Sequence, residues 1–168
     1  MKVIQTKYKG CHFRSRLEAR WAVYFDSIGL EWEYEKEGYK FDDGTYYLPD
    51  FWLPKVKMWA EVKPTKFNEK EITKAKKLVE GEGYPILKLI GVPELKPYSS
   101  IERREDEWID YAEYVLSQYH NYPQEEGRFY SNPGEPLEDY DYYFPDADIA
   151  VIAAKSARFE FGEEGYKK

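Results

Sequence analysis

Cysteine and histidine are scarce in this sequence. Among its 168 residues there are one cysteine, Cys11, and two histidines, His12 and His120. A single cysteine excludes a disulfide bond within the chain, and so few thiols and imidazoles argue against a zinc cluster. If the protein binds a metal ion, we therefore expect oxygen atoms to hold it, as they hold Mg²⁺ and Ca²⁺.

Long apolar segments are absent as well. No run approaches the roughly 18 consecutive apolar residues that a membrane-spanning helix needs, and the first segment, MKVIQTKYKG, lacks the apolar centre of a signal peptide. We therefore expect a cytoplasmic protein with no membrane partner. The length is sufficient for one domain with a core of its own.

Basic residues are outnumbered, but they are not spread evenly. The net charge at pH 7 is −7. Residues 1–20 carry six bases against one acid, or +5, and residues 51–77 carry eight lysines against three glutamates, again +5. Residues 102–168 carry seven bases against seventeen acids, or −10. The total charge argues against nucleic acid as a partner, but the two basic segments could contact its phosphates while the acidic segment stays away.

The spacing of apolar residues predicts an α/β fold in the first half of the chain. In residues 13–29, FRSRLEARWAVYFDSIG, apolar side chains recur on one helix face. Apolar and acidic residues alternate in LEWEYE, residues 30–35, as on a strand with one buried face. The remaining predicted elements are strands at 45–53 and 57–63, a helix from an Asn68 cap to the glycines at 81–83, and an apolar strand at 85–90. The last strand is expected to run parallel to the strand before it, because a helix connects them.

The signals are weaker after Gly91. The helical spacing of apolar residues predicts a helix over residues 101–120, which would form a second layer on the core. Residues 121–145 are rich in proline, glycine, aspartate and tyrosine, which is typical of a long acidic loop. A final helix is predicted from about residue 146 to about residue 158, followed by a frayed end.

Two acids are expected to oppose each other in the predicted hairpin. If its turn is centred between Lys55 and Val56, opposed residues have numbers that sum to 111, and Asp50 then faces Glu61. Strand side chains alternate between faces, so Glu61 and Lys63 share one face. Opposed carboxylates repel each other, and a sequence selected for stability alone would avoid the pair. A divalent cation reverses the sign of that interaction.

These residues suit the chemistry of a hard metal ion. Asp50 and Glu61, with the carbonyl of Val62, offer oxygen ligands for Mg²⁺, for which Mn²⁺ can substitute. Lys63 would orient or deprotonate an attacking water and offset the charge that builds on a phosphate. The sequence thus predicts a metal-dependent hydrolytic site on this hairpin.

The same residues carry a resemblance to a known family. The segment YLPDFWLP, followed by EVK, resembles the PD-(D/E)xK nuclease signature, with Pro49 and Asp50 as its first element and residues 61–63 as its second. In such nucleases the preceding helix supplies another acid, and SRLEARWA offers Glu18 in the matching place. Among relatives, the chain is similar to small phage-type enzymes, including junction resolvases of the phage endonuclease I kind and the transposon-end nuclease TnsA.

The resemblance implies a fold, an activity and a division of the chain. The fold is a restriction-endonuclease-like αβββαβ core, a mixed sheet flanked by helices, with C-terminal helices added. Residues 1–100 would form the nuclease core, and residues 101–168 an acidic, Tyr-rich helical extension packed on it. The activity is Mg²⁺-dependent hydrolysis of DNA to 5′-phosphate and 3′-hydroxyl ends in phage DNA processing, with branched DNA among the candidate substrates and a homodimer among the candidate states.

The resemblance also assigns site residues. The catalytic set is Glu18, Asp50, Glu61 and Lys63. The metal ligands are Asp50, Glu61, Val62 and Glu18. The distribution of charge, and not the resemblance, predicts the contacts to DNA, which we expect from the basic residues Arg14, Arg16, Lys66, Lys70 and Lys74.

Plainer explanations exist for each part of the pattern. Ser15 and Glu18 form the S-x-x-E sequence of a capping box, in which both side chains satisfy backbone amides at a helix start. Residues 49–50 are compatible with a turn at a strand edge, and E-x-K occurs on many exposed strands. The lysines after residue 64 are compatible with a solvated helix face.

Two other functions are therefore kept as alternatives. The chain could be a non-catalytic binding protein on a nuclease-like fold, although the intact Asp50, Glu61 and Lys63 count against this. It could also be an acidic interaction protein whose C-terminal part mimics DNA or binds a partner enzyme.

Overall fold

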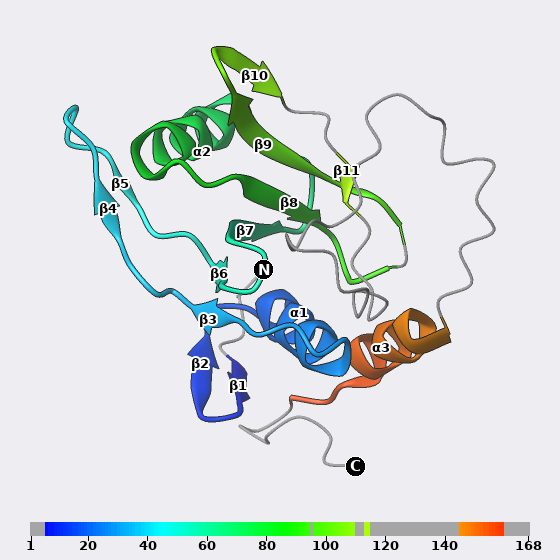
Figure 1. Ribbon diagram of the computed structural model, residues 1–168. Helices are drawn as coiled ribbons and strands as arrows, with labels where there is room; N and C mark the ends of the chain where they lie inside the picture. Colours follow the sequence, from blue (N-terminus) through cyan, green and yellow to red (C-terminus); the bar gives the residue numbers. More distant parts are fainter. Residues whose placement is uncertain (1–5, 95, 110–112, 115–144, 160–168) are drawn as a thin grey trace, which may run out of the picture.

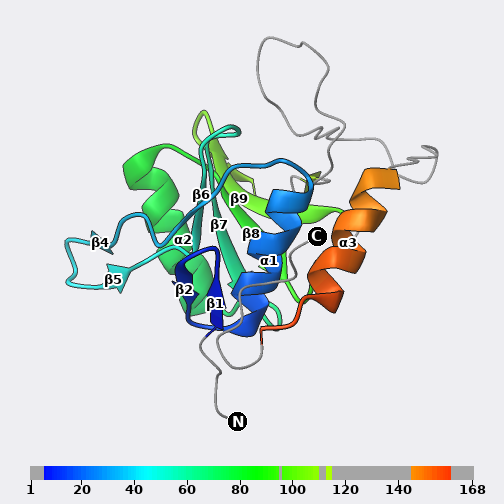
Figure 2. The ribbon, with the colours of Figure 1, turned by 90° about the horizontal axis from the view of Figure 1, so that it is seen from below.

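A computed structural model describes residues 6–94, 96–109, 113–114 and 145–159. These residues form an α/β structure in which a mixed sheet lies between helices (Figures 1 and 2). The α/β class predicted from the sequence is confirmed. None of the helices in the described ranges is long and apolar enough to cross a membrane.

The main sheet has seven strands, six of them in the order β10-β9-β8-β7-β6-β3. Their bounds are β3 Glu33–Tyr34, β6 Phe51–Leu53, β7 Met58–Lys63, β8 Ile86–Ile90, β9 Tyr98–Arg104 and β10 Glu107–Ile109, and β11 Glu113–Tyr114 pairs with β9 off this path. Strands β7 and β8 are parallel, as predicted, and the other pairs are antiparallel. A helix connects the parallel pair because both strands run in one direction and the chain must return between them.

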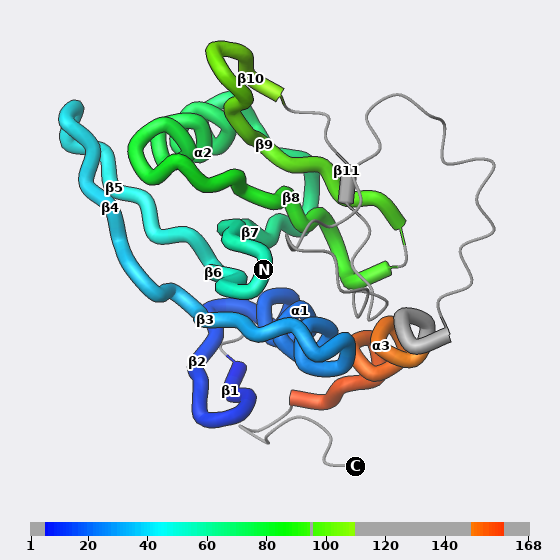
Figure 3. Tube along the Cα trace, in the orientation of Figure 1, coloured from blue at the N-terminus to red at the C-terminus, as the bar shows by residue number. Residues whose placement is uncertain are grey.

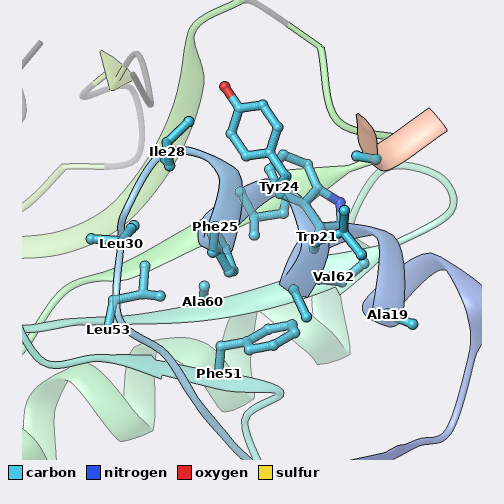
Figure 4. Packing of buried hydrophobic residues seen from close by; sticks show 14 of the residues in the cluster. Ala19, Trp21, Tyr24, Phe25, Ile28, Leu30, Phe51, Leu53, Ala60 and Val62 are labelled. Carbon is cyan, nitrogen blue, oxygen red and sulfur yellow. The ribbon is translucent and has the colours of Figure 1, made fainter. Parts of the chain in front are cut away.

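Helix α1, Arg16–Ser27, covers one face of the sheet, in agreement with the predicted helix. Ser15 caps it, since its side chain accepts a hydrogen bond from the amide of Glu18, and Gly29 follows its end with a φ of 71°. The buried face of α1 packs on the inner side chains of β6 and β7 (Figure 4), and the residues labelled there include Trp21, Tyr24, Phe25, Phe51, Ala60 and Val62. Burial of these apolar side chains stabilises the packing of α1 on the sheet.

Helix α2, Glu69–Glu82, covers the opposite face of the sheet. Asn68 and Glu71 form a capping box at its start, and Gly83 ends it in the left-handed region with a φ of 76°. Its apolar side packs with residues of β7, β8 and β9 in a second cluster that includes Ala75, Leu78, Val79, Trp59, Ile86 and Ile101. Both predicted boundaries of this helix are confirmed, because local capping groups determine them.

Helix α3, Pro145–Ser156, lies beside α1 on the same side of the sheet (Figures 1 and 2). This is the final helix predicted from the sequence. The guanidinium of Arg20 in α1 donates to the carbonyls of Ala154 and Lys155, each at 2.6 Å, and so satisfies groups that the last turn leaves unpaired.

Two hairpins stand outside the main sheet. Strands β1, Thr6–Tyr8, and β2, Cys11–Phe13, form a short hairpin next to α1. Strands β4, Tyr39–Lys40, and β5, Tyr46–Tyr47, form an arm that extends away from the body of the molecule (Figures 1 and 3). The turn predicted at Asp43 and Gly44 lies at the tip of this arm, where Gly44 has a φ of 82°.

The helix predicted over residues 101–120 is wrong. Within the described part of this segment the chain forms strands β9, β10 and β11 instead. Ile101 pairs with Ile86 across the β8–β9 ladder and is completely buried, which a sequence window cannot reveal because the partner is distant. Strand β9 also crosses the expected domain boundary after residue 100. The acidic loop predicted at 121–145 and the frayed end lie outside the described residues, except for Pro145, which begins α3, and Phe159, which is buried.

Two of the predicted strands are shorter in the structure. The strand expected at 30–35 is reduced to β3, and the strand expected at 45–53 is divided into β5 and β6. Asp50 lies in this interruption, directly before β6, and its main-chain carbonyl accepts a hydrogen bond from the amide of Glu35 at 2.8 Å. The break frees the Asp50 side chain to bond to the neighbouring strand.

The Asn68 cap provides a test of the helix that follows the candidate site. Asn68→Ala removes the side-chain acceptor of the Glu71 amide and should lower the free energy of unfolding by about 1 kcal/mol. Asn68→Ser keeps an acceptor and should stay close to the parent. Denaturant unfolding of the three proteins measures the difference. Equal stability of Asn68→Ala and the parent would show that the cap contributes nothing.

Candidate active site

The register of β6 and β7 brings two acids together. The pairs Phe51 with Ala60 and Leu53 with Met58 have numbers that sum to 111, as predicted. One further step along the same register places Asp50 opposite Glu61. Both side chains are buried, with exposed fractions of 2% and 6%. The predicted register is therefore confirmed, and Asp50 and Glu61 lie close enough for the charge of Glu61 to raise the pKa of Asp50.

The Asp50 carboxylate is bound on both oxygens. Its Oδ2 accepts from the amide of Val62 at 2.7 Å, and its Oδ1 accepts from the guanidinium of Arg14 at 2.7 Å. Burial raises the pKa of Asp50 well above its usual value, and the negative charges of Glu61 and Glu18 raise it further. The amide and the guanidinium oppose this shift without cancelling it. A negative charge at this position is therefore costly to the fold.

Glu61 has a similar pair of partners. Its Oε1 lies 2.9 Å from Nζ of Lys63, and its Oε2 accepts from the hydroxyl of Tyr47 at 3.1 Å. Burial raises the pKa of Glu61, against the lowering effect of Lys63 and Tyr47. Each of the two opposed acids is thus compensated by one cation and one neutral donor.

Lys63 is held between strand β7 and helix α2. Its Nζ contacts Glu61 and also lies 3.3 Å from Oε1 of Glu71 in the first turn of α2. Burial lowers the pKa of Lys63, but the two carboxylates outweigh this effect and raise it above its ordinary value. Lys63 is therefore a cation at neutral pH. It suits the roles of orienting a water or offsetting negative charge better than that of a base.

Glu18 caps helix α1 and also acts on the acidic cluster. It accepts from the hydroxyl of Ser15 at 2.8 Å and from the amide of Arg14 at 3.2 Å, so it reaches back over the start of α1 as a capping residue does. It also accepts from the hydroxyl of Tyr34. Its charge nevertheless reaches Asp50 and helps to raise the pKa of that carboxyl. One conformer serves both the cap and the acidic cluster.

Four residues of the site were missed in the sequence, and one of them is Glu71, which contacts Lys63. Tyr47 binds Glu61 from the arm, and Tyr34 and Glu35 lie at the end of β3 beside Arg14. Glu35 has a φ of 45°, which is unusual for a residue with a side chain, and its Oε1 lies 2.5 Å from Nε of Arg14. Alternation in LEWEYE indicates a solvent-facing acid at this position, and only the positive φ, which the sequence does not reveal, turns it toward the site.

The basic residues assigned to DNA divide into two groups. Lys66 and Lys70 are exposed and Lys74 is half-buried, at the start of α2, and the described residues form no ion pair with them. Arg14 is bound to acids of the site, and Nε of Arg16 is buried without a hydrogen-bond partner among the described residues. The three lysines are the group that the structure leaves available for phosphates.

The donor set suits a hard metal ion but is not preformed for one. In the described part of the chain, no three His, Cys, Asp or Glu side chains form a group that could hold a metal ion. Protein donors already bind both oxygens of Asp50 and of Glu61. The chemistry fits, because buried carboxylates with raised pKa values are stabilised by a nearby cation. Binding would require these oxygens to exchange a protein donor for the ion.

No family model matches the chain, and no curated protein matches it either. The resemblance to the PD-(D/E)xK nucleases therefore depends on the motif residues themselves. Their geometry is compatible with that resemblance, since the two motif acids and the motif lysine lie together at adjacent strand ends.

Asp50→Asn tests whether the buried charge lowers the free energy of unfolding. A raised folded-state pKa means that the folded protein holds the proton more tightly than the unfolded chain, so stability is lost as pH rises through that range. In EDTA at about pH 7.5 the mutant should equal or exceed the parent in free energy of unfolding, and its advantage should shrink toward about pH 5. Asparagine also keeps an acceptor for the Val62 amide.

Asp43→Asn provides a control in which the pKa of the replaced carboxyl is lowered and not raised. Asp43 is exposed at the tip of the arm, and its hydrogen bond from Lys77 lowers its pKa. Its mutant should therefore be no more stable than the parent near neutral pH, and any difference should vanish in acid. If Asp50→Asn were the less stable protein at both pH values, Asp50 would be a structural hydrogen-bonding residue.

Proposed function

We propose that this protein is a Mg²⁺-dependent DNA endonuclease that leaves 5′-phosphate and 3′-hydroxyl ends. The observation that carries the proposal is the convergence of Asp50, Glu61 and Lys63 at adjacent ends of β6 and β7, with the charge of Glu18 acting on Asp50. Two opposed, buried carboxylates beside a lysine are unfavourable for stability and suitable for binding a cation at a phosphate.

Four groups of this chain would hold the metal ion. Asp50 and Glu61 supply carboxylate oxygens, Val62 its carbonyl, and Glu18 a carboxylate toward the same ion or a second one. Mg²⁺ held in this way, or Mn²⁺ in its place, supplies a Lewis acid at the phosphate and lowers the pKa of a bound water. Lys63, held as a cation by Glu61 and Glu71, orients the water and offsets charge on the phosphate.

DNA would approach along the start of α2. This helix follows β7 after a short connection. Lys66 lies in that connection, and Lys70 and Lys74 lie in α2, the helix whose Glu71 contacts Lys63. The setting that we propose is phage DNA processing in the cytoplasm of a bacterium or an infected host cell. Branched DNA is a candidate substrate, and a homodimer would allow both strands to be cut.

One observation favours a non-catalytic alternative on the same fold. Arg14 and Lys63 form ion pairs with the acids of the site, so each acid already has a cation beside it without a metal ion. A protein that only binds DNA or a partner would keep this arrangement and would show no metal-dependent cleavage. Incubation with supercoiled, linear and four-way-junction DNA, in Mg²⁺ and in EDTA, separates the two functions.

Lys63→Ala tests the catalytic role of the lysine. Loss of one transition-state contact should reduce the Mg²⁺-dependent rate of plasmid cleavage by at least about a hundredfold. Lys55→Ala removes the same charge from the exposed turn of the same hairpin and should cleave at the parental rate. Circular dichroism and thermal melting check that both variants are folded. Equal rates of Lys63→Ala and the parent would exclude the proposed role of Lys63.

The lysines of α2 are tested by the salt dependence of binding. Each lost phosphate contact lowers the slope of log affinity against log salt concentration by about 0.9, so replacing Lys66, Lys70 and Lys74 together by glutamine should lower it by about 2.7. Lys76 and Lys77 serve as controls, because they contact the Trp108 ring and Asp43 respectively. Fluorescence anisotropy with a short duplex gives the slope for the parent, the triple variant and the control variants. An unchanged slope in the triple variant would place DNA elsewhere.

A further inference from the structure

Arg14 lies at the centre of the acidic cluster and not on an open basic surface. It follows β2, and its side chain reaches two acids that come from different parts of the chain. The guanidinium binds Asp50 Oδ1 at 2.7 Å and Glu35 Oε1 at 2.5 Å. The main-chain amide of Arg14 donates to Glu18 at 3.2 Å and to the hydroxyl of Tyr34 at 3.0 Å.

The contact with Asp50 uses the one oxygen on which a metal ion would depend. Oδ2 of Asp50 is bound to the amide of Val62, which belongs to the ladder end of β7 and cannot leave without disturbing the sheet. Oδ1 is therefore the oxygen that can change its partner. Arg14 occupies it, and its side chain is 55% exposed, so the guanidinium has room to move outward.

We propose that Arg14 competes with the divalent cation for Oδ1 of Asp50, and that the guanidinium released by the cation contacts a phosphate of the nucleic acid. The proposal rests on the proposed nuclease function and adds a regulation of the same site. Without metal, Arg14 neutralises a carboxylate that is only 2% exposed. With metal, the same guanidinium is released from Asp50 and becomes available to a phosphate only when the cation is bound.

Glu35 would keep Arg14 at the site during this exchange. Oε1 of Glu35 forms an ion pair with Nε of Arg14, and this Nε donates its hydrogen to the hydroxyl of Tyr34 at 3.5 Å, whereas Asp50 binds the terminal nitrogen. Loss of the Asp50 contact therefore leaves the contacts of Nε in place. The amide of Glu35 is fixed by the carbonyl of Asp50 at 2.8 Å, which keeps this second acid next to the first. An arginine suits this exchange because its fork of donors binds carboxylate and phosphate with similar geometry.

Metal binding in the absence of DNA gives the first test. Thermal melting of the full chain is followed against Mg²⁺ concentration for the parent, Arg14→Gln and Arg103→Gln. Arg14→Gln should melt below the parent in EDTA, but the Mg²⁺ concentration for its half-maximal shift should be about tenfold lower, because its competitor is gone. Arg103→Gln is the control. Arg103 lies on β9, which β8 separates from the site strand β7, and it is paired with Glu80 of α2. This variant should keep the Mg²⁺ midpoint of the parent.

Binding of DNA gives the second test, with cleavage prevented by Lys63→Ala in every protein. In Mg²⁺, adding Arg14→Gln should weaken binding of a short duplex by about tenfold, since a charged phosphate contact is lost. In EDTA the same substitution should change binding by less than about twofold, because Arg14 is then occupied by Asp50. An equal loss in both conditions would overturn the exchange and leave Arg14 as an ordinary phosphate contact.

The outcomes separate this inference from the proposed function. If the melting temperature of the parent does not respond to Mg²⁺, the proposed function fails together with the inference. If the parent responds and Arg14→Gln needs as much Mg²⁺ or more, only the competition is refuted. Should Arg14→Gln not fold, Arg14→Lys keeps the charge but loses the fork of donors that reaches both Asp50 and Glu35, so it should compete less well and lower the Mg²⁺ midpoint in the same direction. A midpoint equal to or above that of the parent would refute the competition.

Discussion

The burial of two opposed carboxylates, Asp50 and Glu61, is the constraint on which this end of the molecule depends. Like charges across a ladder repel each other, and the low polarity of the surroundings strengthens the repulsion. In the structure, each of the two acids contacts one cation and one neutral hydrogen-bond donor. Asp50 has Arg14 and a backbone amide, and Glu61 has Lys63 and a phenol. The loop before α1 and the arm thus turn side chains toward these two acids, and the end of β3 contacts Arg14, the partner of Asp50.

The aromatic core keeps these partners in place. The indole of Trp21 in α1 donates to the carbonyl of Gly91 at 2.9 Å, and the amide of Gly91 donates to the carbonyl of Lys63 at 2.8 Å. Trp21 is completely buried, so this chain of bonds ties the end of β7 to the helix whose first turn carries Glu18. A site that must hold charges at fixed separations benefits from such attachment to a rigid core.

Features decided by neighbours in sequence could be predicted, and features decided by distant partners could not. The Asn68 cap, the Gly83 stop and the hairpin register follow from a few adjacent residues, and all three are as expected. Strand β9 was mistaken for a helix because its apolar residues satisfy a helical spacing, while its pairing with β8 is a long-range contact. Arg14 was assigned to DNA from its local charge, but Asp50, the partner that decides its position, is 36 residues away.

The energetics of the acid pair bear on the choice between an enzyme and a non-catalytic relative. Replacement of buried ionic groups by packed apolar residues is often neutral or stabilising, whereas removal of one partner alone is strongly destabilising. A protein without need of a cation would therefore gain stability from apolar residues at positions 50 and 61, next to Phe51 and Ala60. The chain instead keeps both acids and surrounds them with donors that do not fully restore their ordinary pKa values. Sites that violate local rules of stability in this way are expected where a ligand supplies the missing compensation, which is the physical support for a metal-binding site at these strand ends.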